Sequence, residues 1–207
     1  MEKYLEQARE RAIQCIRVEA SSLGKQIEEL QSSDSFLRAV QMIDTCAGKV
    51  IFTGIGKSGL CGAKIAASFS SIGIPSFFLD PIGAYHGQLG VISNQDLLVF
   101  ISYSGQTEEL LRLAGHVTAR VPVICVCGYT DSPLATMSDC VLKIRVDSEA
   151  DPLRIIPTSS VITTLAIGDA LTSALMNIRG ISLPDVLANH PGGSIGSAIA
   201  SGLGDIG

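Results

Sequence analysis

Two short segments rich in glycine and serine carry the residues best suited to bind an anion. The first, GIGKSG, spans residues 54–59, and the second, SYSGQT, spans residues 102–107. Each follows an apolar run and precedes a segment that we expect to be helical. Glycines allow tight turns, and the free N–H groups at the start of a helix attract negative charge. We therefore expect both segments to line one anion-binding site.

The first segment taken alone is compatible with three kinds of site. It matches the dinucleotide-binding pattern G-x-G-x-x-G, and Asp80 ends the next strand where a ribose-binding acid would stand. Lys57 and Ser58 match the end of the triphosphate-binding pattern, but Ile51 stands where that pattern requires its first glycine. The third kind is a sugar-phosphate site.

The second segment favours the sugar phosphate. Ser102, Ser104 and Thr107 offer three hydroxyl groups within six residues, and Gly105 permits a tight bend. Hydroxyls and free backbone N–H groups suit a single phosphate monoester. The simpler alternative is that Ser104 or Thr107 only caps the following helix, which would require one hydroxyl.

Composition indicates one globular domain with an appended arm. The chain has 207 residues, of which 46% are apolar and 17% charged, enough to bury a core. The net charge is −5 and no run of Lys or Arg occurs, which argues against a nucleic-acid partner. No run of eighteen apolar residues is present, so we expect no membrane span.

The cysteines and the N-terminal segment indicate the cytoplasm. The six cysteines form no C-x-x-C pair, and we expect buried free thiols in a reducing compartment and no metal site. The first residues are charged and amphipathic and lack the apolar core of a signal peptide. The cysteines are Cys15, Cys46, Cys61, Cys125, Cys127 and Cys140.

Apolar periodicity predicts a three-layer α/β/α sandwich with a five-stranded parallel sheet, preceded by N-terminal helices. We expect a helical arm over residues 1–47 that packs on the domain or on another subunit, a domain over 48–196 and a tail over 197–207. The arm would hold helices over 2–30 and from Ser33 or Asp34 to 46. The expected strands are 49–53, 75–79, 96–101, 122–126 and 140–144, and the later helices are 58–72, 107–119, 132–137 and 158–179.

Five motifs between residues 50 and 196 resemble a known family. They are TGIGKSG, PIGAYHGQLG, ISYSGQTEEL, EADPLRIIPTSS and NHPGGSIG. Together they are similar to the sugar isomerase (SIS) domain of the D-arabinose 5-phosphate isomerases. S-x-S-G-x-T alone marks the broad SIS superfamily, whereas the loops with His-Gly-x-Leu-Gly, Pro-Thr-Ser-Ser and His-Pro-Gly-Gly are more specific.

The resemblance implies a function and a set of partners. The family interconverts D-ribulose 5-phosphate and D-arabinose 5-phosphate, which feeds synthesis of Kdo for lipopolysaccharide. It uses no metal or organic cofactor, and its members are typically tetramers with active sites at subunit contacts. Many members continue into a tandem CBS pair, so this chain is expected to be either a short form or a piece of a longer protein. Gln106 stands where relatives often carry Glu, which removes a charge from the phosphate loop.

The resemblance and the loop positions together give the candidate site. We assign catalytic roles to Glu149, His190, His86, Lys57 and Glu109. We assign phosphate binding to Ser58, Ser102, Ser104, Gly105, Gln106 and Thr107. Further substrate contacts are expected from Gly56, Thr158 and Ser159.

Several of these residues also have a purely structural interpretation. Glu149 is either the base that moves a proton between C1 and C2 or a solvated loop acid. His190 and His86 either transfer protons, with His86 supplied by a neighbouring subunit, or serve only the structure of their loops. Lys57 either contacts the phosphate or the enediolate, or forms an ion pair with Glu109. His116 is expected to be an exposed helical side chain.

Two other functions remain open. One is another phosphosugar isomerase of the same fold, acting on a 6-phospho-3-hexulose or a heptose phosphate. The other is a sugar-phosphate-binding SIS module without catalysis.

Overall fold

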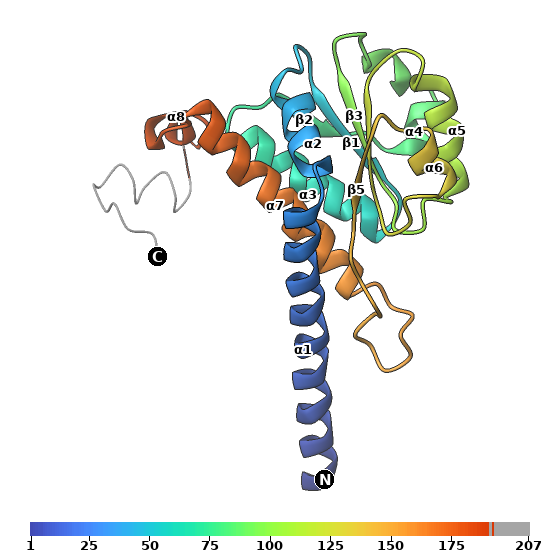
Figure 1. Cartoon of the computed structure of the whole chain (residues 1–207), viewed down its shortest axis with the longest axis vertical. Helices are drawn as coiled ribbons and strands as arrows, with labels where there is room; N and C mark the ends of the chain where they lie inside the picture. The colour runs from blue at the N-terminus through green and yellow to red at the C-terminus, as the bar shows by residue number, and fades with distance from the viewer. Residues whose placement is uncertain (191, 193–207) are drawn as a thin grey trace.

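The computed structural model describes residues 1–190 and 192. Its centre is a five-stranded, all-parallel sheet with the strand order β2-β1-β3-β4-β5 (Figure 1). The residues of β1, β3 and β4 are buried throughout, as expected for strands covered on both faces. The strands are β1 (Val50–Gly54), β2 (Ser76–Phe78), β3 (Leu97–Ile101), β4 (Val123–Cys127) and β5 (Cys140–Lys143).

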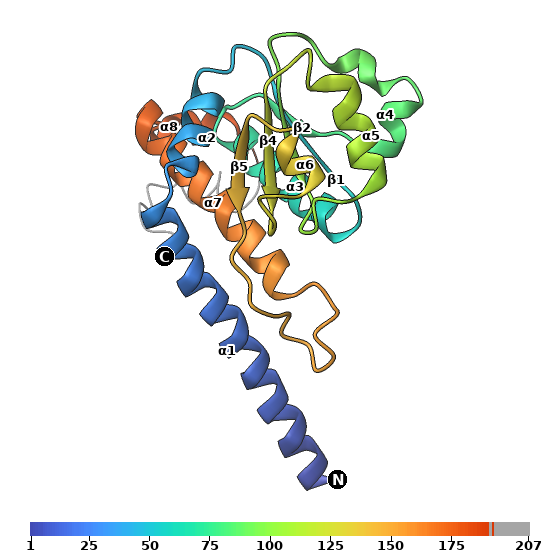
Figure 2. The ribbon, with the colours of Figure 1, turned by 45° about the vertical axis from the view of Figure 1, so that its right-hand side comes forward.

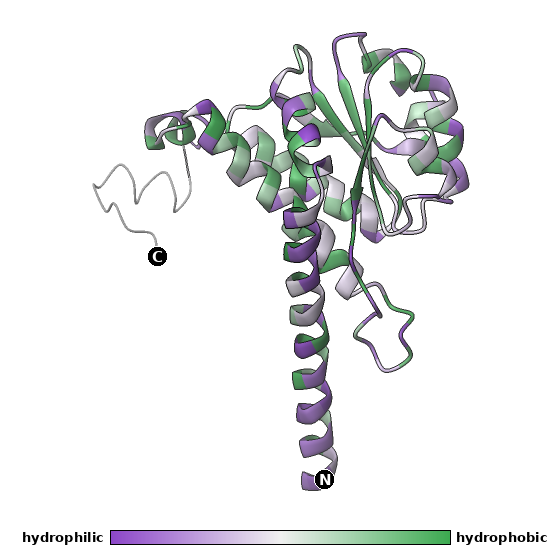
Figure 3. Ribbon diagram, in the orientation of Figure 1, coloured by the Kyte–Doolittle hydropathy of each residue, from purple (hydrophilic) through white to green (hydrophobic). Residues whose placement is uncertain are grey.

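Helices cover both faces of the sheet, which confirms the predicted three-layer sandwich. On one face, α2 (Ser35–Asp44), α3 (Lys57–Ser71) and α7 (Ser159–Arg179) build one apolar cluster with the strands. On the other face, α4 (Pro81–Tyr85), α5 (Glu108–Val117) and α6 (Pro133–Thr136) build a second cluster. Figure 2 shows the two layers from a second direction, and Figure 3 shows the apolar residues gathered along the strands.

Three short elements were not predicted from the sequence: α4, η1 (Gln88–Val91) and α8 (Leu183–Ala188). Asp80 explains the first of them. Its carboxylate accepts hydrogen bonds from the N–H groups of Ile82 (3.4 Å) and Gly83 (2.9 Å), and Pro81 occupies the first helical position. Asp80 is therefore an N-cap.

The long helix α1 (Glu2–Ser32) has two different halves. Its first half projects away from the domain, and every residue up to 14 is exposed (Figures 1 and 2). Its second half packs on α7 and buries Ser22 and Gln26. Gln26 donates to the carbonyl of Lys143 (3.0 Å) and accepts from the N–H of Arg145 (2.8 Å). The side-chain amide thus makes hydrogen bonds with backbone groups at the open edge of β5, where a further strand would otherwise pair.

Among the described residues, one helix, α7, has the length and apolar composition of a membrane span. It packs against α1 and α3, and its Asp169 forms an ion pair with Lys64 of α3. Its buried face also carries hydroxyl groups, including those of Thr163 and Thr164. These contacts make α7 a core helix of the domain.

Candidate active site

The first glycine segment forms the turn between β1 and α3. Gly56 adopts a positive φ of +59°, a conformation that favours glycine, and α3 begins at Lys57 directly after it. Gly56 has no side chain with which to cap the helix. The first N–H groups of α3 therefore point out of the carboxyl edge of the sheet, where the helix dipole favours an anion.

The second segment forms a compact turn between β3 and α5. The buried Ser102 hydroxyl lies 3.0 Å from the Thr107 hydroxyl and accepts the N–H of Gly105 (3.2 Å). The Ser104 hydroxyl accepts the N–H of Gln106 (3.2 Å). Thr107 occupies the N-cap position of α5, but its side chain makes no capping hydrogen bond. The simple helix cap therefore does not account for the Thr107 hydroxyl.

The sheet brings the two turns together. Gly54, the last residue of β1, lies opposite Ile101, the last residue of β3. The chain runs from β1 to β2 on one side and continues with β3 on the other, so the strand order reverses between β1 and β3. Ligands of open parallel sheets bind at this reversal, beyond the carboxyl ends of the strands.

A pocket of about 430 Å³ lies beside these turns. It combines residues from the start of α3, the second turn, the loop after β5 and the first turns of α7. Lys57, Ser58 and Glu149, which the sequence proposed as site residues, all line it. The complete described lining is Ile55, Lys57, Ser58, Cys61, Tyr103, Glu149, Ile155, Pro157, Ser160, Val161 and Thr164.

Glu149 is held by the start of α7. Its carboxylate accepts hydrogen bonds from the N–H (2.7 Å) and hydroxyl (3.1 Å) of Thr158, and from the N–H (3.2 Å) and hydroxyl of Ser160. The Thr158 hydroxyl in turn accepts the N–H of Ala150 (2.7 Å). Glu149 thus caps α7 from the loop that leads into this helix, and its position is fixed by four donors.

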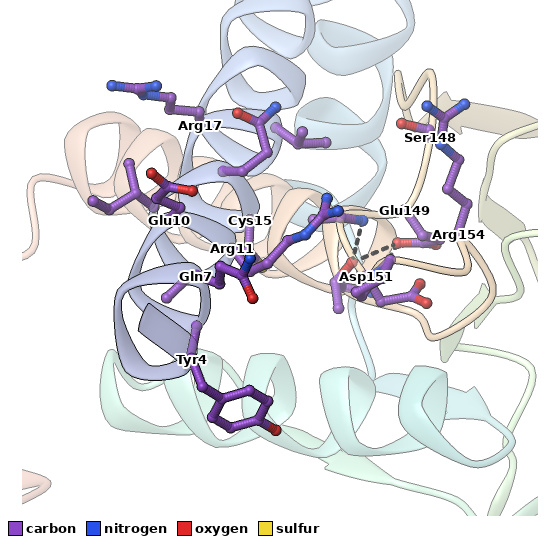
Figure 4. Close-up of a pocket in the computed structure, with 18 residues that line it drawn as sticks. Tyr4, Gln7, Glu10, Arg11, Cys15, Arg17, Ser148, Glu149, Asp151 and Arg154 are labelled. Carbon is purple, nitrogen blue, oxygen red and sulfur yellow. Dashed lines mark hydrogen bonds between the residues drawn. The ribbon is translucent and has the colours of Figure 1, made fainter. Parts of the chain in front are cut away.

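The loop that carries Glu149 is built around Asp151. The Asp151 carboxylate accepts the N–H groups of Leu153 (2.9 Å), Ile155 (2.7 Å) and Ile156 (2.8 Å). Desolvation acts to raise the pKa of Asp151, but these backbone donors outweigh it and lower the pKa below its ordinary value. Figure 4 shows Asp151 and Glu149 in this loop, facing α1. The loop therefore has a defined conformation beside the pocket.

The Pro-Thr-Ser-Ser segment contributes a different serine from the one expected. Ser160 lines the pocket, whereas Ser159 is fully buried and its hydroxyl has no hydrogen-bond partner within residues 1–190. Consecutive helical residues point about 100° apart, so two adjacent serines cannot share one face. Ser160 and Thr164, four residues apart, do share it. Ser159 and Thr163 have the same spacing in the sequence, so only the packing of α7 decides which pair lines the pocket.

The two loop histidines do not join Glu149 within one chain. His190 follows the C-cap of α8, and its Nδ1 lies 2.7 Å from the carbonyl of Val186. Its neighbour Asn189 donates to Ser71, at the end of α3 opposite the pocket (3.3 Å). The 21 residues of α7, about 31 Å long, separate this end from Glu149. His86 lies exposed after α4 and is not in the described pocket lining.

Three further residues discussed from the sequence, Lys57, Glu109 and His116, have exposed side chains. Lys57 is exposed and forms no ion pair in the described part of the chain, so the alternative pairing with Glu109 is not observed. Glu109 lies exposed in the first turn of α5. His116 is exposed, as predicted, and its ring meets that of Tyr85 edge-on at 6.0 Å.

The thiols match the prediction of free cysteines. All six are unpaired, and Cys61, Cys125, Cys127 and Cys140 are buried. The neighbouring Cys125 thiol is the largest influence on Cys127 and lowers the pKa of Cys127 below its ordinary value. No group of three metal-binding side chains occurs within the described residues.

Sequence comparison identifies the family. A family model of the SIS domain matches residues 45–174. The chain belongs to the SIS-domain family. Two curated relatives are arabinose 5-phosphate isomerases: GutQ of Salmonella typhimurium (41% identity over 186 residues, 89% of this chain and 56% of the relative) and KdsD of Escherichia coli K12 (41% over 175 residues, 84% and 53%). The chain spans about half the length of these relatives.

Solved structures support the same assignment of this SIS domain. A candidate sugar-phosphate isomerase of Listeria monocytogenes has a TM-score of 0.85 and 31% identity, covering 89% of this chain and 97% of that chain. An E. coli CFT073 protein solved in complex with arabinose 5-phosphate has a TM-score of 0.76 and 34% identity. The match covers 84% of this chain and 95% of that chain. These matches confirm the expected SIS fold, including its resemblance to the arabinose 5-phosphate isomerases.

Proposed function

We propose that this SIS domain interconverts D-ribulose 5-phosphate and D-arabinose 5-phosphate. The observation that carries the proposal is the pocket in which Lys57 and Glu149 face the same space, beside the serine-rich turn at the strand-order reversal. The arabinose 5-phosphate isomerases named above, at 41% identity, support the same substrate. The expected binding residues Gly56, Ser58 and Gln106 belong to the two turns that would receive the phosphate.

The reaction needs a proton to move between C1 and C2. A base removes a C1 proton of the ketose while the C2 carbonyl oxygen gains a proton, which gives a cis-enediol. Return of a proton to C2 and loss of the O1 proton then leave the C1 aldehyde and the C2 hydroxyl. The phosphate would lie at Ser102, Ser104 and Thr107, with the sugar extending into the pocket. Lys57 would stabilise the negative charge that develops on the enediolate oxygens.

Glu149 and the histidines share the proton transfers in this proposal. Three of the four donors bond to Oε2 of Glu149 and one to Oε1, so Oε1 is the oxygen with a lone pair left to accept a proton. His86 and His190 lie away from the pocket of their own chain, so we assign them to the site of a neighbouring copy. Glu109 would provide electrostatic support from the start of α5.

The projecting half of α1 supports a homo-oligomer, which we propose to be a tetramer. Its exposed apolar side chains include Leu5 (60% exposed) and Ile16 (66%). A groove of about 1,440 Å³ separates this half from the Glu149 loop, and Figure 4 shows Arg11 extending across it. A helix that packs on nothing is marginally stable in water. We therefore expect a second copy of the chain to bury the exposed apolar side chains of this half of α1.

We also propose a cytoplasmic setting and a role in supplying Kdo for lipopolysaccharide. The free thiols support a reducing compartment. The family resemblance supports the pathway, since arabinose 5-phosphate is the precursor that those isomerases provide.

A direct assay tests the proposed reaction. Purified protein is incubated with D-ribulose 5-phosphate and with six- and seven-carbon ketose phosphates, and the aldose products are identified by NMR. We expect D-arabinose 5-phosphate as the preferred product, without added metal. A preference for the hexulose or heptose phosphate would replace the proposed substrate with that of another phosphosugar isomerase.

The hydrogen bonds of Glu149 favour one alternative, a module that binds sugar phosphate without catalysis. Both carboxylate oxygens bond to the start of α7, which gives the pocket a wall whose position is fixed without substrate. The same assay separates the two functions. A pure binding module would show a raised Tm with each ligand and no conversion.

A further inference from the structure

Tyr103 connects the serine-rich turn to the segment that carries Glu149. It lies between Ser102 and Ser104, and its side chain lines the pocket. Its phenol hydroxyl donates to the carbonyl of Val146 at 3.3 Å. Val146 precedes Glu149 by three residues, so one side chain joins the two halves of the proposed site.

The ring is fixed in place by the loop after β4. A Cβ atom on Gly128 would lie 2.7 Å from the Tyr103 ring, so only glycine permits this approach. The N–H of Gly128 donates to the Tyr103 carbonyl (2.9 Å), and the Tyr129 ring meets Tyr103 edge-on at 5.8 Å. Tyr103 therefore has a defined orientation before any ligand arrives.

The segment after β5 depends on side chains for its position. Its final backbone bond to the sheet joins the N–H of Ile144 to the carbonyl of Cys127 (2.8 Å). Beyond that point, Gln26 accepts the N–H of Arg145 and Tyr103 donates to Val146. Burial, and to a lesser extent Tyr129 and Glu149, raises the pKa of Tyr103, so the phenol remains a proton donor at neutral pH.

We propose that Tyr103 is a positioning residue that couples phosphate binding in the 102–107 turn to the placement of Glu149. This inference rests on the proposed function. A phosphate that orders Ser102 and Ser104 also orders Tyr103 between them, and the bond to Val146 transmits that order to the Glu149 segment. Such coupling is reciprocal, so loosening the segment also loosens the turn.

Hydrogen exchange and kinetics on Tyr103→Phe test the coupling, because this change removes the hydroxyl and keeps the ring. Tyr129→Phe is the matched control. In the wild type, inorganic phosphate should slow amide exchange in both 102–107 and 146–151. In Tyr103→Phe, phosphate should still protect 102–107, while its protection of 146–151 should fall by about three- to tenfold, the range for one lost neutral hydrogen bond.

The kinetic readout separates positioning from a general loss of structure. We expect kcat for the sugar phosphate to fall about three- to tenfold. Because the coupling is reciprocal, the Kd for inorganic phosphate should rise by no more than about the same factor. Exchange in β3 and β4 and the Tm should stay close to those of Tyr129→Phe. Equal protection of 146–151 in both variants and the wild type would overturn the coupling.

The outcome also distinguishes this inference from the proposed function. If the wild type does not isomerise any sugar phosphate, the enzymatic proposal fails and the exchange data still decide the coupling. If phosphate does not protect 102–107 in the wild type, the phosphate site itself is wrong and the coupling falls with it.

Discussion

Glu149 shows how one side chain serves both structure and the proposed chemistry. Its carboxylate accepts four hydrogen bonds from the first turn of α7 and also lines the pocket with Lys57. The solvated loop acid does not describe this arrangement, and the role of Glu149 as the base stays a prediction. A carboxylate with this many donors is held accurately in place, and its removal leaves helix N–H groups without an acceptor.

Glu149→Gln tests both roles. The amide presents an NH₂ group to donors of Thr158 or Ser160, so we expect the free energy of unfolding to fall by about 1–3 kcal/mol. We also expect at least a 100-fold loss of kcat if Glu149 is the base. Urea unfolding and the isomerase assay measure the two effects. Asp147→Asn, at an exposed residue paired with Lys25, is the control and should change stability by less than about 0.5 kcal/mol.

The buried carboxylate of Asp96 leads to a prediction of how the stability of the fold depends on pH. Its buried carboxylate accepts the N–H groups of Lys49 and Ser93, each at 2.8 Å, and the Lys49 ammonium at 3.0 Å. Desolvation raises its pKa, but these donors outweigh it, so the pKa lies below the ordinary 3.8. A lowered pKa stabilises the fold above the unfolded value, and the effect is lost as the pH falls through the folded value.

Asp96→Asn should therefore lose about 1–3 kcal/mol of stability at pH 7. The difference from the wild type should shrink below about pH 4, because the wild-type carboxylate is then increasingly protonated. Denaturant unfolding across pH 3–7 measures this. Asp34→Asn is the control, since the Asp34 side chain makes no capping hydrogen bond. A pH-independent difference would contradict the assigned role of the carboxylate charge.

Among the elements, the turn between β3 and α5 depends on Gly105. Its φ is +62°, and a Cβ atom there would lie 2.0 Å from the Ser132 hydroxyl oxygen. The turn and the start of α6 are packed against each other, as the hydrogen bond from the N–H of Leu134 to the Gly105 carbonyl (3.1 Å) confirms.

We predict that Gly105→Ala lowers stability by about 2–4 kcal/mol, from backbone strain together with overpacking. The Kd for inorganic phosphate should rise at least tenfold, because the turn must open to admit the methyl group. Thermal unfolding and calorimetric titration measure these effects. Gly115→Ala in α5 has open space around it and should instead stabilise the protein by up to about 1 kcal/mol.

The second element-scale prediction concerns the edge of β5. Gln26→Ala leaves the Lys143 carbonyl and the Arg145 N–H without their side-chain partners. We expect a loss of about 1–3 kcal/mol in stability and faster amide exchange at Arg145. Gln31→Ala, at an exposed position of the same helix, is the comparison. Unchanged exchange at Arg145 would show that water replaces the amide at no cost.

At the scale of the whole molecule, the projecting half of α1 determines the expected assembly. Ile16→Glu places a charge on its exposed apolar surface, where the proposed interface would lie. We predict that the mass measured by light scattering falls to that of a smaller assembly, with isomerase activity reduced at least tenfold if a neighbouring copy supplies a histidine. Leu37→Glu on α2 is matched in exposure, at 66%, and should keep the wild-type mass. An unchanged mass for Ile16→Glu would reject the arm as an interface.

Much of the domain could be predicted from the sequence because its signals are local. Continuous apolar runs identified the buried parallel strands, and glycines followed by a helical segment identified the two turns. The short helix α4 was missed because five residues carry no periodicity, although Asp80 and Pro81 are a recognisable helix start. Gln26 was missed because its partners Lys143 and Arg145 lie more than one hundred residues away.

The sequence by itself determined the layered fold, the two turns at one edge of the sheet and the family. Only the tertiary structure decided which candidates meet. It placed Lys57 and Glu149 in the lining of one pocket, turned Ser160 rather than Ser159 toward that pocket, and separated His190 from Glu149 by the length of α7. The physical reason is that residue types and local spacing set the elements, whereas contacts between distant side chains depend on how those elements pack.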